Sequence, residues 1–306
     1  MGLAAESHPG TDRLHVPVML SEVRALLCDR PRQLVVDATV GTGGHAEALL
    51  EAGAGGTLIG MDRDPRALEV AGTRLGRFGA RVILRQADFA EVERVLGEAG
   101  FAAADAIFAD LGMSSYALDD PARGFSFRFE GPLDMRMDPR GELRAYDLVN
   151  EEGEDELARI IREFGEERAA RRIARAIVEA RRRRPLETTT ELRALIERAA
   201  GGRRHRAIHP ATRTFQALRI AVNHELESLR VFLDRAPGCL APGGRLAIIA
   251  YHSLEDRPVK HHFRALAHEG GFVALTPRAL RPQASECAHN PRARSARLRA
   301  IERSAP

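Results

Sequence analysis

The sequence predicts an α/β fold with a mostly parallel sheet, interrupted by a helical insertion. In the first third of the chain, short β-branched apolar runs alternate with amphipathic stretches, which is the pattern of βαβ units. The alternation stops after Asp110, and a strongly apolar run returns only at Leu246–Ala250. We therefore expect a discontinuous α/β domain at 1–113 and 212–306, with a helical insertion at 114–211.

Four strands are expected before the insertion, each an apolar run that ends at a turn. They are Leu34–Val40, Thr57–Asp62, Arg81–Gln86 and Ala104–Asp110. The stretches between them carry apolar residues at helical spacing, as at Ala67, Leu68, Ala71 and Leu75. Crossovers of this length favour right-handed connections and a parallel sheet, whose ligands bind beyond the carboxyl ends of the strands.

Helical patterns dominate the insertion after its turn-rich first part, at Asp155–Arg184 and Thr190–Ala200. A long amphipathic helix is expected next, over Thr212–Arg235, and it leads to the fifth strand. Two further strands are expected at Phe272–Thr276 and Arg297–Glu302.

The composition excludes several classes of protein. No apolar run among the 306 residues approaches the roughly 20 residues that a membrane-spanning helix needs. Residues 1–14 contain no signal-peptide core, and Cys28, Cys239 and Cys287 have neither an even number nor a metal-ligand spacing. We expect a cytoplasmic protein without a membrane partner, a disulfide framework or a metal. The oligomeric state stays open, with a homodimer among the alternatives.

The positive charge is clustered, although the net charge is only +3. Arg159–Arg184 contains ten arginines and four glutamates, and Arg278–Arg303 contains seven arginines and two glutamates. Arginine pairs bidentately with phosphate, so the clusters suit an RNA partner. Solvated helix faces would give the same pattern, and the clusters alone do not decide between the two interpretations.

A glycine-rich turn follows the first strand, in Asp37-Ala-Thr-Val-Gly-Thr-Gly-Gly-His45. Glycines let the backbone approach a ligand, and the N–H groups of the next helix lie nearby. The second strand ends at Asp62, about 20 residues later, where a carboxylate can accept hydrogen bonds from both ribose hydroxyls. The two features together indicate a cofactor that contains adenosine. We expect His45 to begin a helix and to meet the cofactor with its backbone N–H.

The glycine turn leaves two cofactors open. Gly41, Gly43 and Ala46 also satisfy the dinucleotide pattern, so an NAD-dependent dehydrogenase is one alternative. The turn that starts at Leu240 and the pair Asp88-Phe89 resemble features of S-adenosylmethionine-dependent methyltransferases, and they favour S-adenosylmethionine. A non-enzymatic protein that binds RNA through its basic helices is the remaining alternative.

The fourth strand delivers Asp110 to the same sheet edge, followed by Ser114, Ser115 and Tyr116. The exocyclic amine of a base is a poor nucleophile because its lone pair is delocalised into the ring. Asp110 can accept a hydrogen bond from that amine, and alignment with a methyl donor supplies much of the rest. We predict Asp110 and Ser114 as catalytic residues, with Ser115 and Tyr116 binding the base.

Aromatic side chains after this strand are a second candidate for stacking on an extruded base. Phe125, Phe127 and Phe129 could stack in this way, but we expect them to fill a small core instead. Ser253-Leu-Glu-Asp256 has the form of a helix-capping box, so we expect Ser253 to cap a helix rather than to catalyse.

A specific resemblance covers the chain from His15 almost to its end. Nine strings, in one order, resemble the bacterial small-subunit ribosomal RNA cytosine-N4 methyltransferase family. They are Asp110-Leu-Gly-Met-Ser-Ser115, Arg123-Gly-Phe-Ser-Phe127, Gly131-Pro-Leu-Asp-Met-Arg-Met-Asp138, Gly165-Glu-Glu-Arg168, Arg172-Ile-Ala-Arg-Ala-Ile177, His209-Pro-Ala-Thr-Arg-Thr-Phe-Gln-Ala217, Leu240-Ala-Pro-Gly-Gly-Arg245, His252-Ser-Leu-Glu-Asp-Arg257 and Asn290-Pro-Arg-Ala-Arg-Ser295.

The resemblance implies a class I, Rossmann-like methyltransferase fold with an inserted helical domain that recognises RNA. It implies S-adenosylmethionine as methyl donor and, as acceptor, N4 of a decoding-region cytidine of 16S ribosomal RNA in the small subunit. By position, the cofactor contacts would be Gly43, Gly44, His45, Asp62, Phe89 and Asp110.

Two further positions are assigned to the substrate within the matching strings, Arg123 and His252. One position departs from the family pattern, because Ala117 stands where the family usually has a glutamine at the cofactor site. This departure puts one cofactor contact in doubt.

Overall fold

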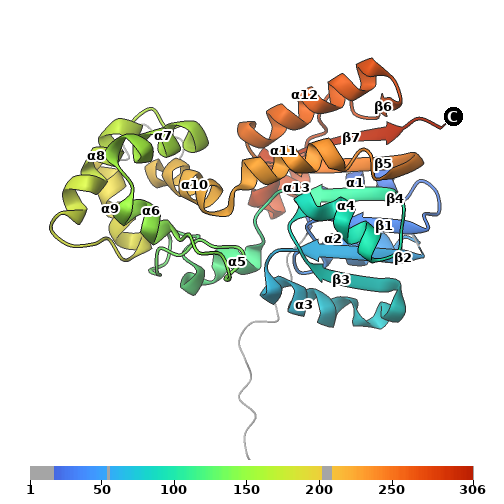
Figure 1. The fold of residues 1–306 in the computed structure, drawn as a ribbon, viewed down its shortest axis with the longest axis horizontal. Coiled ribbons are helices and arrows are strands. Elements are labelled where there is room, and N and C mark those ends of the chain that lie inside the picture. Colours follow the sequence, from blue (N-terminus) through green and yellow to red (C-terminus); the bar gives the residue numbers. More distant parts are fainter. Residues whose placement is uncertain (1–16, 54–55, 202–208, 306) are drawn as a thin grey trace, which may run out of the picture.

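The computed structural model describes residues 17–53, 56–201 and 209–305. Figure 1 shows an α/β part, which holds the sheet, beside a separate layer of helices. The predicted lack of a signal-peptide core in residues 1–14 falls outside the described residues. Within the described ranges no helix combines the length and apolar character needed to cross a membrane.

The described residues form one seven-stranded sheet in the order β3-β2-β1-β4-β5-β7-β6. The first five strands pair in parallel, and β7 runs antiparallel to both β5 and β6. The strands are β1 (Leu34–Asp37), β2 (Thr57–Asp62), β3 (Val82–Gln86), β4 (Ala104–Asp110), β5 (Leu240–Ala250), β6 (Phe272–Ala274) and β7 (Arg297–Arg303). The α/β fold with a mostly parallel sheet is therefore confirmed.

Helices cover both faces of the sheet, which explains why its central strands are apolar throughout. In β1, Leu34 and Val36 pack into one core, whereas Val35 packs into the core on the other face. One face is covered by α4 (Val92–Glu98), α11 (Glu225–Arg235) and α12 (Ser253–Glu269). The other is covered by α1 (Leu20–Leu27), α2 (Gly44–Glu51) and α3 (Pro65–Leu75).

The strand order reverses at β1, which lies between β2 and β4. The chain leaves β1 toward β2 and later returns to β4 on its other side. In open parallel sheets such a reversal opens a crevice at the carboxyl ends of the strands, where ligands bind.

The helical layer has its own hydrophobic core, built from residues between Ala117 and Val222. Its elements are α5 (Ser115–Asp119), α6 (Ala145–Glu151), α7 (Glu154–Gly165), α8 (Ala170–Arg181), α9 (Thr189–Ala199) and α10 (Pro210–Asn223). The remaining short elements of the fold as a whole are η1 (Gly76–Arg81), η2 (Phe89–Glu91), η3 (Pro121–Arg123), η4 (Pro291–Ser295) and α13 (Ala284–His289). Because α10 contributes Phe215 and Leu218 to this core, it packs with the helical layer, beyond residue 211.

The long helix expected over Thr212–Arg235 is wrong, because the chain forms two helices there, α10 and α11. The break is at His224, whose φ of +50° is left-handed. The side chain of the preceding Asn223 binds the loop before α6. Its Nδ2 donates to the carbonyl of Met135, and its Oδ1 accepts from the N–H of Met137. This long-range anchor fixes the break.

A similar break divides the pattern at Asp155–Arg184 into α7 and α8. Glu166 has a φ of +48°, and a Cβ on Gly165 would lie 2.5 Å from the carbonyl oxygen of Arg213. The fifth strand begins at Leu240, earlier than the expected Leu246, so the predicted turn forms its irregular first half.

Candidate active site

Three aspartates end neighbouring strands at one edge of the sheet: Asp37 on β1, Asp62 on β2 and Asp110 on β4. Because β1 lies between the other two, Asp37 sits between the two predicted site residues. The sequence analysis did not select Asp37, although it ends a strand just as the other two do. Three carboxyl groups are therefore concentrated at this sheet edge.

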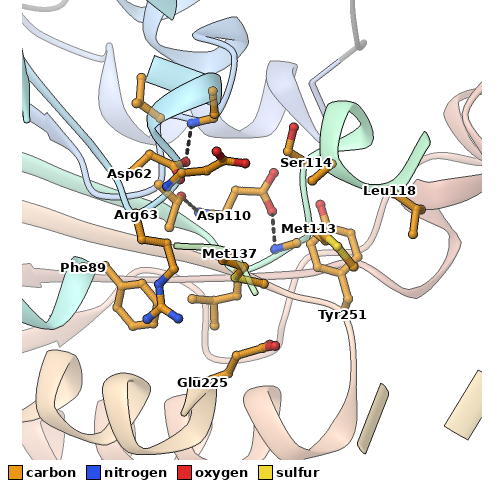
Figure 2. Close-up of a pocket in the computed structure, with 18 of the residues that line it drawn as sticks. Asp62, Arg63, Phe89, Asp110, Met113, Ser114, Leu118, Met137, Glu225 and Tyr251 are labelled. Carbon is orange, nitrogen blue, oxygen red and sulfur yellow. Dashed lines mark hydrogen bonds between the residues drawn. The ribbon is translucent and has the colours of Figure 1, made fainter. Parts of the chain in front are cut away.

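Asp62 is held by backbone N–H groups on both of its carboxylate oxygens. Oδ2 accepts a hydrogen bond from Gly41 at 2.9 Å, and Oδ1 accepts one from Asp64 at 2.9 Å. Burial raises the pKa of Asp62 to about 6, and these hydrogen bonds act against that rise. The carboxylate is thus fixed beside the glycine turn (Figure 2).

Asp110 is fixed from both its backbone and its side chain. Its backbone N–H donates to Thr39 Oγ1 at 2.7 Å, and its Oδ1 accepts from the N–H of Gly112 at 3.2 Å. Burial, followed by the charge of this carboxylate, raises the pKa of Tyr251 well above its usual value. A Cβ on Gly112 would lie 2.5 Å from the Tyr251 ring, so only glycine admits this close packing.

Asp37 differs from its two neighbours because it is almost fully buried. Its Oδ1 accepts a hydrogen bond from the N–H of Thr39, whereas Oδ2 is buried and has no hydrogen-bond partner among the residues that the structure describes. Burial, and next the charges of Asp110 and Asp62, raise the pKa of Asp37 to about 8. At neutral pH Asp37 is therefore mainly protonated and uncharged.

A cavity of about 560 Å³ opens at this edge, and its size is that of a small-molecule or cofactor site. The sheet side contributes Gly41, Gly44, His45, Asp62, Phe89 and Asp110 to its lining. The opposite side, formed by the helical layer and the first residue of α11, contributes Met137, Arg219 and Glu225, and Figure 2 shows Glu225 across the cavity from Asp62. The cavity therefore lies between the α/β part and the helical layer.

The glycine turn gives the cavity an open backbone surface. Gly41 and Gly43 have left-handed φ values of +51° and +84°, and Gly43 is the N-cap of α2. The helix begins at Gly44, and His45 follows as its second residue. The His45 ring is buried, with Nε2 3.0 Å from the carbonyl oxygen of Val18, and burial lowers its pKa. This ring contacts the backbone of Val18, and the contact of the His45 N–H with a cofactor stays a prediction.

Phe89 lines the cavity from η2, where its ring packs edge-on against Phe232 at 5.4 Å between centroids. The guanidinium of Arg63 lies 6.0 Å from the Phe89 centroid and pairs with Asp88. Phe89 and Arg63 thus form a flat surface next to Asp62, of the kind on which a purine ring can stack.

The predicted base-binding residues do not all meet at the cavity. Ser114 and His252 line it, and the Ser114 hydroxyl also caps α5 by accepting from the N–H of Tyr116 at 3.2 Å. Tyr116 is 46% exposed and lies outside the cavity lining. The side chain of Ser115 falls outside what the structure describes.

Arg123 also lies outside the cavity lining, because its guanidinium is committed to contacts within the protein. Nη1 binds Asp64 Oδ2 at 2.7 Å, and Nη2 donates to the carbonyl oxygens of Arg136 and Met137 at 2.9 and 3.0 Å. Arg123 is buried, so the structure gives it an internal partner in place of a substrate.

The phenylalanines after β4 divide into two groups. Phe125 is buried in the core of the helical layer, and Phe127 packs against His209 and Phe215. Phe129 is 48% exposed, so it does not fill the core as expected.

The expected helix cap at Ser253 is wrong, because the N-cap of α12 is His252. Glu255 reaches back and accepts hydrogen bonds from the N–H groups of Tyr251 and His252, while the Ser253 hydroxyl donates to Glu166 at 2.6 Å. Ser253 thereby links α12 to the helical layer.

Tyr251, Arg219 and Glu225 are among the cavity residues that the sequence did not predict. Tyr251 directly precedes the string that starts at His252, and this position is the only signal that could have found it. Arg219 and Glu225 form a bidentate ion pair at 2.8 and 2.9 Å across the break between α10 and α11. The pair depends on that break, so the expectation of one long helix concealed it.

Ala117 lines the cavity and is buried. The side chain at this position is too short to donate a hydrogen bond to a ligand, whereas the glutamine of the family pattern could do so. Among the described residues, no group of three or more His, Cys, Asp and Glu side chains is arranged to hold a metal ion.

Comparison with known proteins agrees with the resemblance seen in the sequence. The ribosomal RNA small subunit methyltransferase H of Syntrophotalea carbinolica is 51% identical over 306 residues, covering 94% of this chain and 98% of that protein. The protein of the same name from Gloeobacter violaceus is 50% identical, covering 100% of this chain and 93% of that protein.

Solved structures are more distant. An rRNA methylase from Streptococcus thermophilus has a TM-score of 0.43 and 14% identity, over 95% of this chain and 99% of that one. The model of the MraW methylase family matches residues 12–304, nearly the whole chain. The chain therefore belongs to the MraW methylase family.

Proposed function

We propose that this protein transfers a methyl group from S-adenosylmethionine to N4 of a decoding-region cytidine in 16S ribosomal RNA. The observation that carries the proposal is the position of Asp110, which faces a cavity that Asp62 and the glycine turn also line. Family membership supports methyl transfer, and the names of the close relatives support ribosomal RNA of the small subunit as the acceptor.

The sheet side of the cavity fits the methyl donor. Asp62 would accept hydrogen bonds from the ribose, Phe89 would meet the adenine, and the backbone at Gly43, Gly44 and His45 would meet the remainder of the molecule. The open turn supports this assignment, because a Cβ on Gly41 would contact only the Thr39 carbonyl oxygen. The donor supplies an electrophilic methyl group on a positively charged sulfur, and the carboxylates of Asp62 and Asp110 favour a cation nearby.

Asp110 and its neighbours fit the acceptor amine. A carboxylate oxygen of Asp110 can accept a hydrogen bond from N4 and turn its lone pair toward the methyl group. The Gly112 N–H holds this carboxylate in one orientation, so little reorganisation is needed when the amine arrives. Ser114 and His252 line the same region and would contact the base.

The predicted insertion at 114–211, which forms most of the helical layer, is assigned to RNA recognition, and it supplies the charge that a large RNA needs. Exposed arginines lie along α7 and α8 and in the turn after them: Arg162, Arg168, Arg171, Arg172, Arg175, Arg182, Arg183 and Arg184. Phosphate contacts of this kind weaken as salt concentration rises. We propose the small ribosomal subunit, in the cytoplasm, as the partner.

The test is a methylation assay with purified protein, labelled S-adenosylmethionine and small subunits that lack the modification. We expect the label on one cytosine, identified as N4-methylcytosine by mass spectrometry of the digested RNA. Absence of label on competent subunits would contradict the proposal, as would binding of a nicotinamide cofactor detected by its fluorescence. RNA binding without methyl transfer would favour a non-enzymatic role instead.

A further inference from the structure

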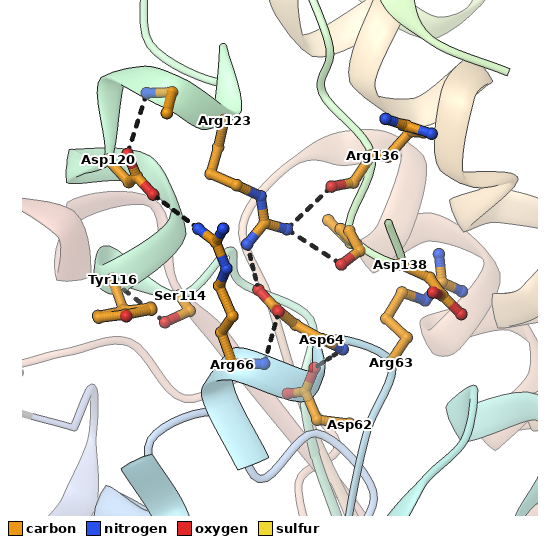
Figure 3. A network of polar contacts seen from close by, with 12 residues as sticks. Asp62, Arg63, Asp64, Arg66, Ser114, Tyr116, Asp120, Arg123, Arg136 and Asp138 are labelled. Carbon is orange, nitrogen blue, oxygen red and sulfur yellow. Dashed lines mark hydrogen bonds and ion pairs between the residues drawn. The ribbon is translucent and has the colours of Figure 1, made fainter. Parts of the chain in front are cut away.

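Three consecutive residues at the end of β2 have three different partners (Figure 3). All three line the cavity, and the two residues after Asp62, Arg63 and Asp64, also bind the helical layer. The strand end that would hold the ribose is therefore also an attachment point for the opposite wall of the cavity.

Arg123 makes the more buried of the two attachments. The Arg123 and Asp64 side chains are only 10% and 8% exposed, so their ion pair is well shielded from water. The other terminal nitrogen of the Arg123 guanidinium, Nη2, donates to the carbonyl oxygens of Arg136 and Met137, and Met137 lines the cavity. One guanidinium thus joins the donor strand to the cavity wall that faces it.

Asn223 holds the same wall from its other side. Its side chain binds the carbonyl of Met135 and the N–H of Met137, and its own carbonyl accepts a hydrogen bond from Arg63 Nη1 at 2.7 Å. Met135 has a left-handed φ of +61°, a conformation that costs energy and needs such contacts to persist. The segment from Met135 to Met137 is therefore fixed relative to β2 at two points.

Asp64 also connects Arg123 to the Asp62 carboxylate. The N–H of Asp64 donates to Asp62 Oδ1, so a shift of Asp64 moves a hydrogen bond that orients the predicted ribose ligand. The charged groups that face Asp62 are Asp64 and Arg63 on its own strand end, and Asp37 on β1 is a titratable neighbour that is uncharged at neutral pH. Arg123 neutralises Asp64, and without it Asp64 would be a buried, unpaired negative charge next to Asp62.

We propose that Arg123 is a positioning residue for the methyl donor, acting through Asp64 on Asp62 and through Met137 on the facing wall. This inference rests on the proposed function, because it assigns the donor to the Asp62 side of the cavity. It gives Arg123 a role in donor binding, in place of the substrate contact that the sequence suggested.

The test measures the affinity of the full-length protein for S-adenosylhomocysteine by calorimetry between pH 5 and pH 8. In a second experiment, kcat and KM for methyl transfer are measured with small subunits as acceptor. For Arg123→Met we expect about a 10-fold loss of affinity and a matching rise in the KM for S-adenosylmethionine, with a smaller change in kcat. We also expect the pH midpoint of donor binding to rise, because unpaired Asp64 disfavours the charged form of Asp62.

Two variants separate positioning from simple stability. Arg123→Lys keeps a positive charge beside Asp64 but cannot also hold both carbonyl oxygens, so it should restore the pH midpoint more fully than the affinity. Asp64→Asn removes the neighbouring negative charge, so the midpoint should move in the opposite direction, to lower pH. This variant keeps the inference testable if Arg123→Met fails to fold.

Arg66→Met is the matched control. Arg66 joins the same two regions through Asp120 at 3.2 Å, but its side chain is 55% exposed, so the loss of its ion pair should change donor affinity less than about 2-fold. A folded Arg123→Met protein with wild-type affinity and wild-type pH midpoint would overturn this inference but not the proposed function. Failure of the wild-type protein to bind the donor would overturn both this inference and the proposed function.

Discussion

The two walls of the cavity are built in different ways. On the sheet wall, backbone N–H groups hold the aspartates, and the donors lie within two residues of Asp37 and Asp110. On the helical wall, side chains make the holding contacts. Arg219 pairs with Glu225 across the break between α10 and α11, and Arg63 donates to the backbone carbonyl of Asn223, 160 residues away.

We infer from this difference that the sheet wall mainly determines reactivity and the helical wall mainly determines folding stability. Backbone donors on a rigid sheet keep their positions when a carboxylate is replaced, so changes on the sheet wall should alter reactivity more than folding. Ion pairs on the helical wall lose a buried partner when one residue is replaced, so changes there should alter stability first. Substitutions on each wall test this division.

Asp110→Asn should have the largest effect. The amide cannot provide the same charged acceptor for the target amine, so we expect kcat for methyl transfer to fall by about 10²-fold to 10³-fold. The free energy of unfolding, measured in urea, should change little. A variant that keeps activity within a few-fold of wild type would show that Asp110 does not act on the amine.

Glu225→Gln should have the reverse effect of Asp110→Asn, with a larger loss of stability than of activity. It leaves the mostly buried Arg219 without its charged partner, and we expect the free energy of unfolding to fall by about 3 kcal/mol. Urea titration followed by circular dichroism measures this change. Glu227→Gln, on the same helix but with a 62% exposed side chain, is the control and should match wild type. Equal stability of all three proteins would refute the division between the walls.

Asp62→Asn should weaken donor binding by about 10-fold, because a charge-assisted hydrogen bond becomes a neutral one. In the wild type, the pKa of about 6 means that affinity should be constant above neutral pH and fall as the carboxylate becomes protonated below pH 6. Calorimetry at several pH values measures both effects. The variant should lack the fall, and a fall that persists would have to come from another group.

Asp37→Asn should have the smallest effect, and the effect should grow as pH rises. The folded-state pKa of about 8 lies above the ordinary value of 3.8, so the wild type keeps its full stability below pH 4 and loses stability as pH rises from 4 through 8. The variant has no such proton to lose. Thermal unfolding of the two proteins should therefore agree near pH 4 and favour the variant at pH 8, and the opposite order would contradict a neutral Asp37.

The same division explains how far the sequence predicts the structure. Asp62 and Asp110 could be located because alternation marks the strands, and parallel strands bring their carboxyl ends to one edge. Asp37 was available to the same reasoning, but its burial depends on β1 lying at the centre of the sheet. The sheet wall is thus largely a local property of the sequence.

The helical wall could not be predicted in this way. The break at His224 is fixed by contacts of Asn223 with Met135 and Met137, which no periodicity in the helix reveals. The partners of Arg123 are equally remote, since Asp64 lies 59 residues away. Motif matching found Arg123, but only the packed structure shows that its charge is used inside the protein.

The protonated state of Asp37 bears on how the enzyme would release its product. With Asp37 neutral, the sheet edge presents the charges of Asp62 and Asp110, which attract a sulfonium but have no such attraction for a thioether. Under the proposed reaction, methyl transfer removes the positive charge from sulfur and with it that attraction. The chemical step would therefore weaken binding of the demethylated donor and favour turnover.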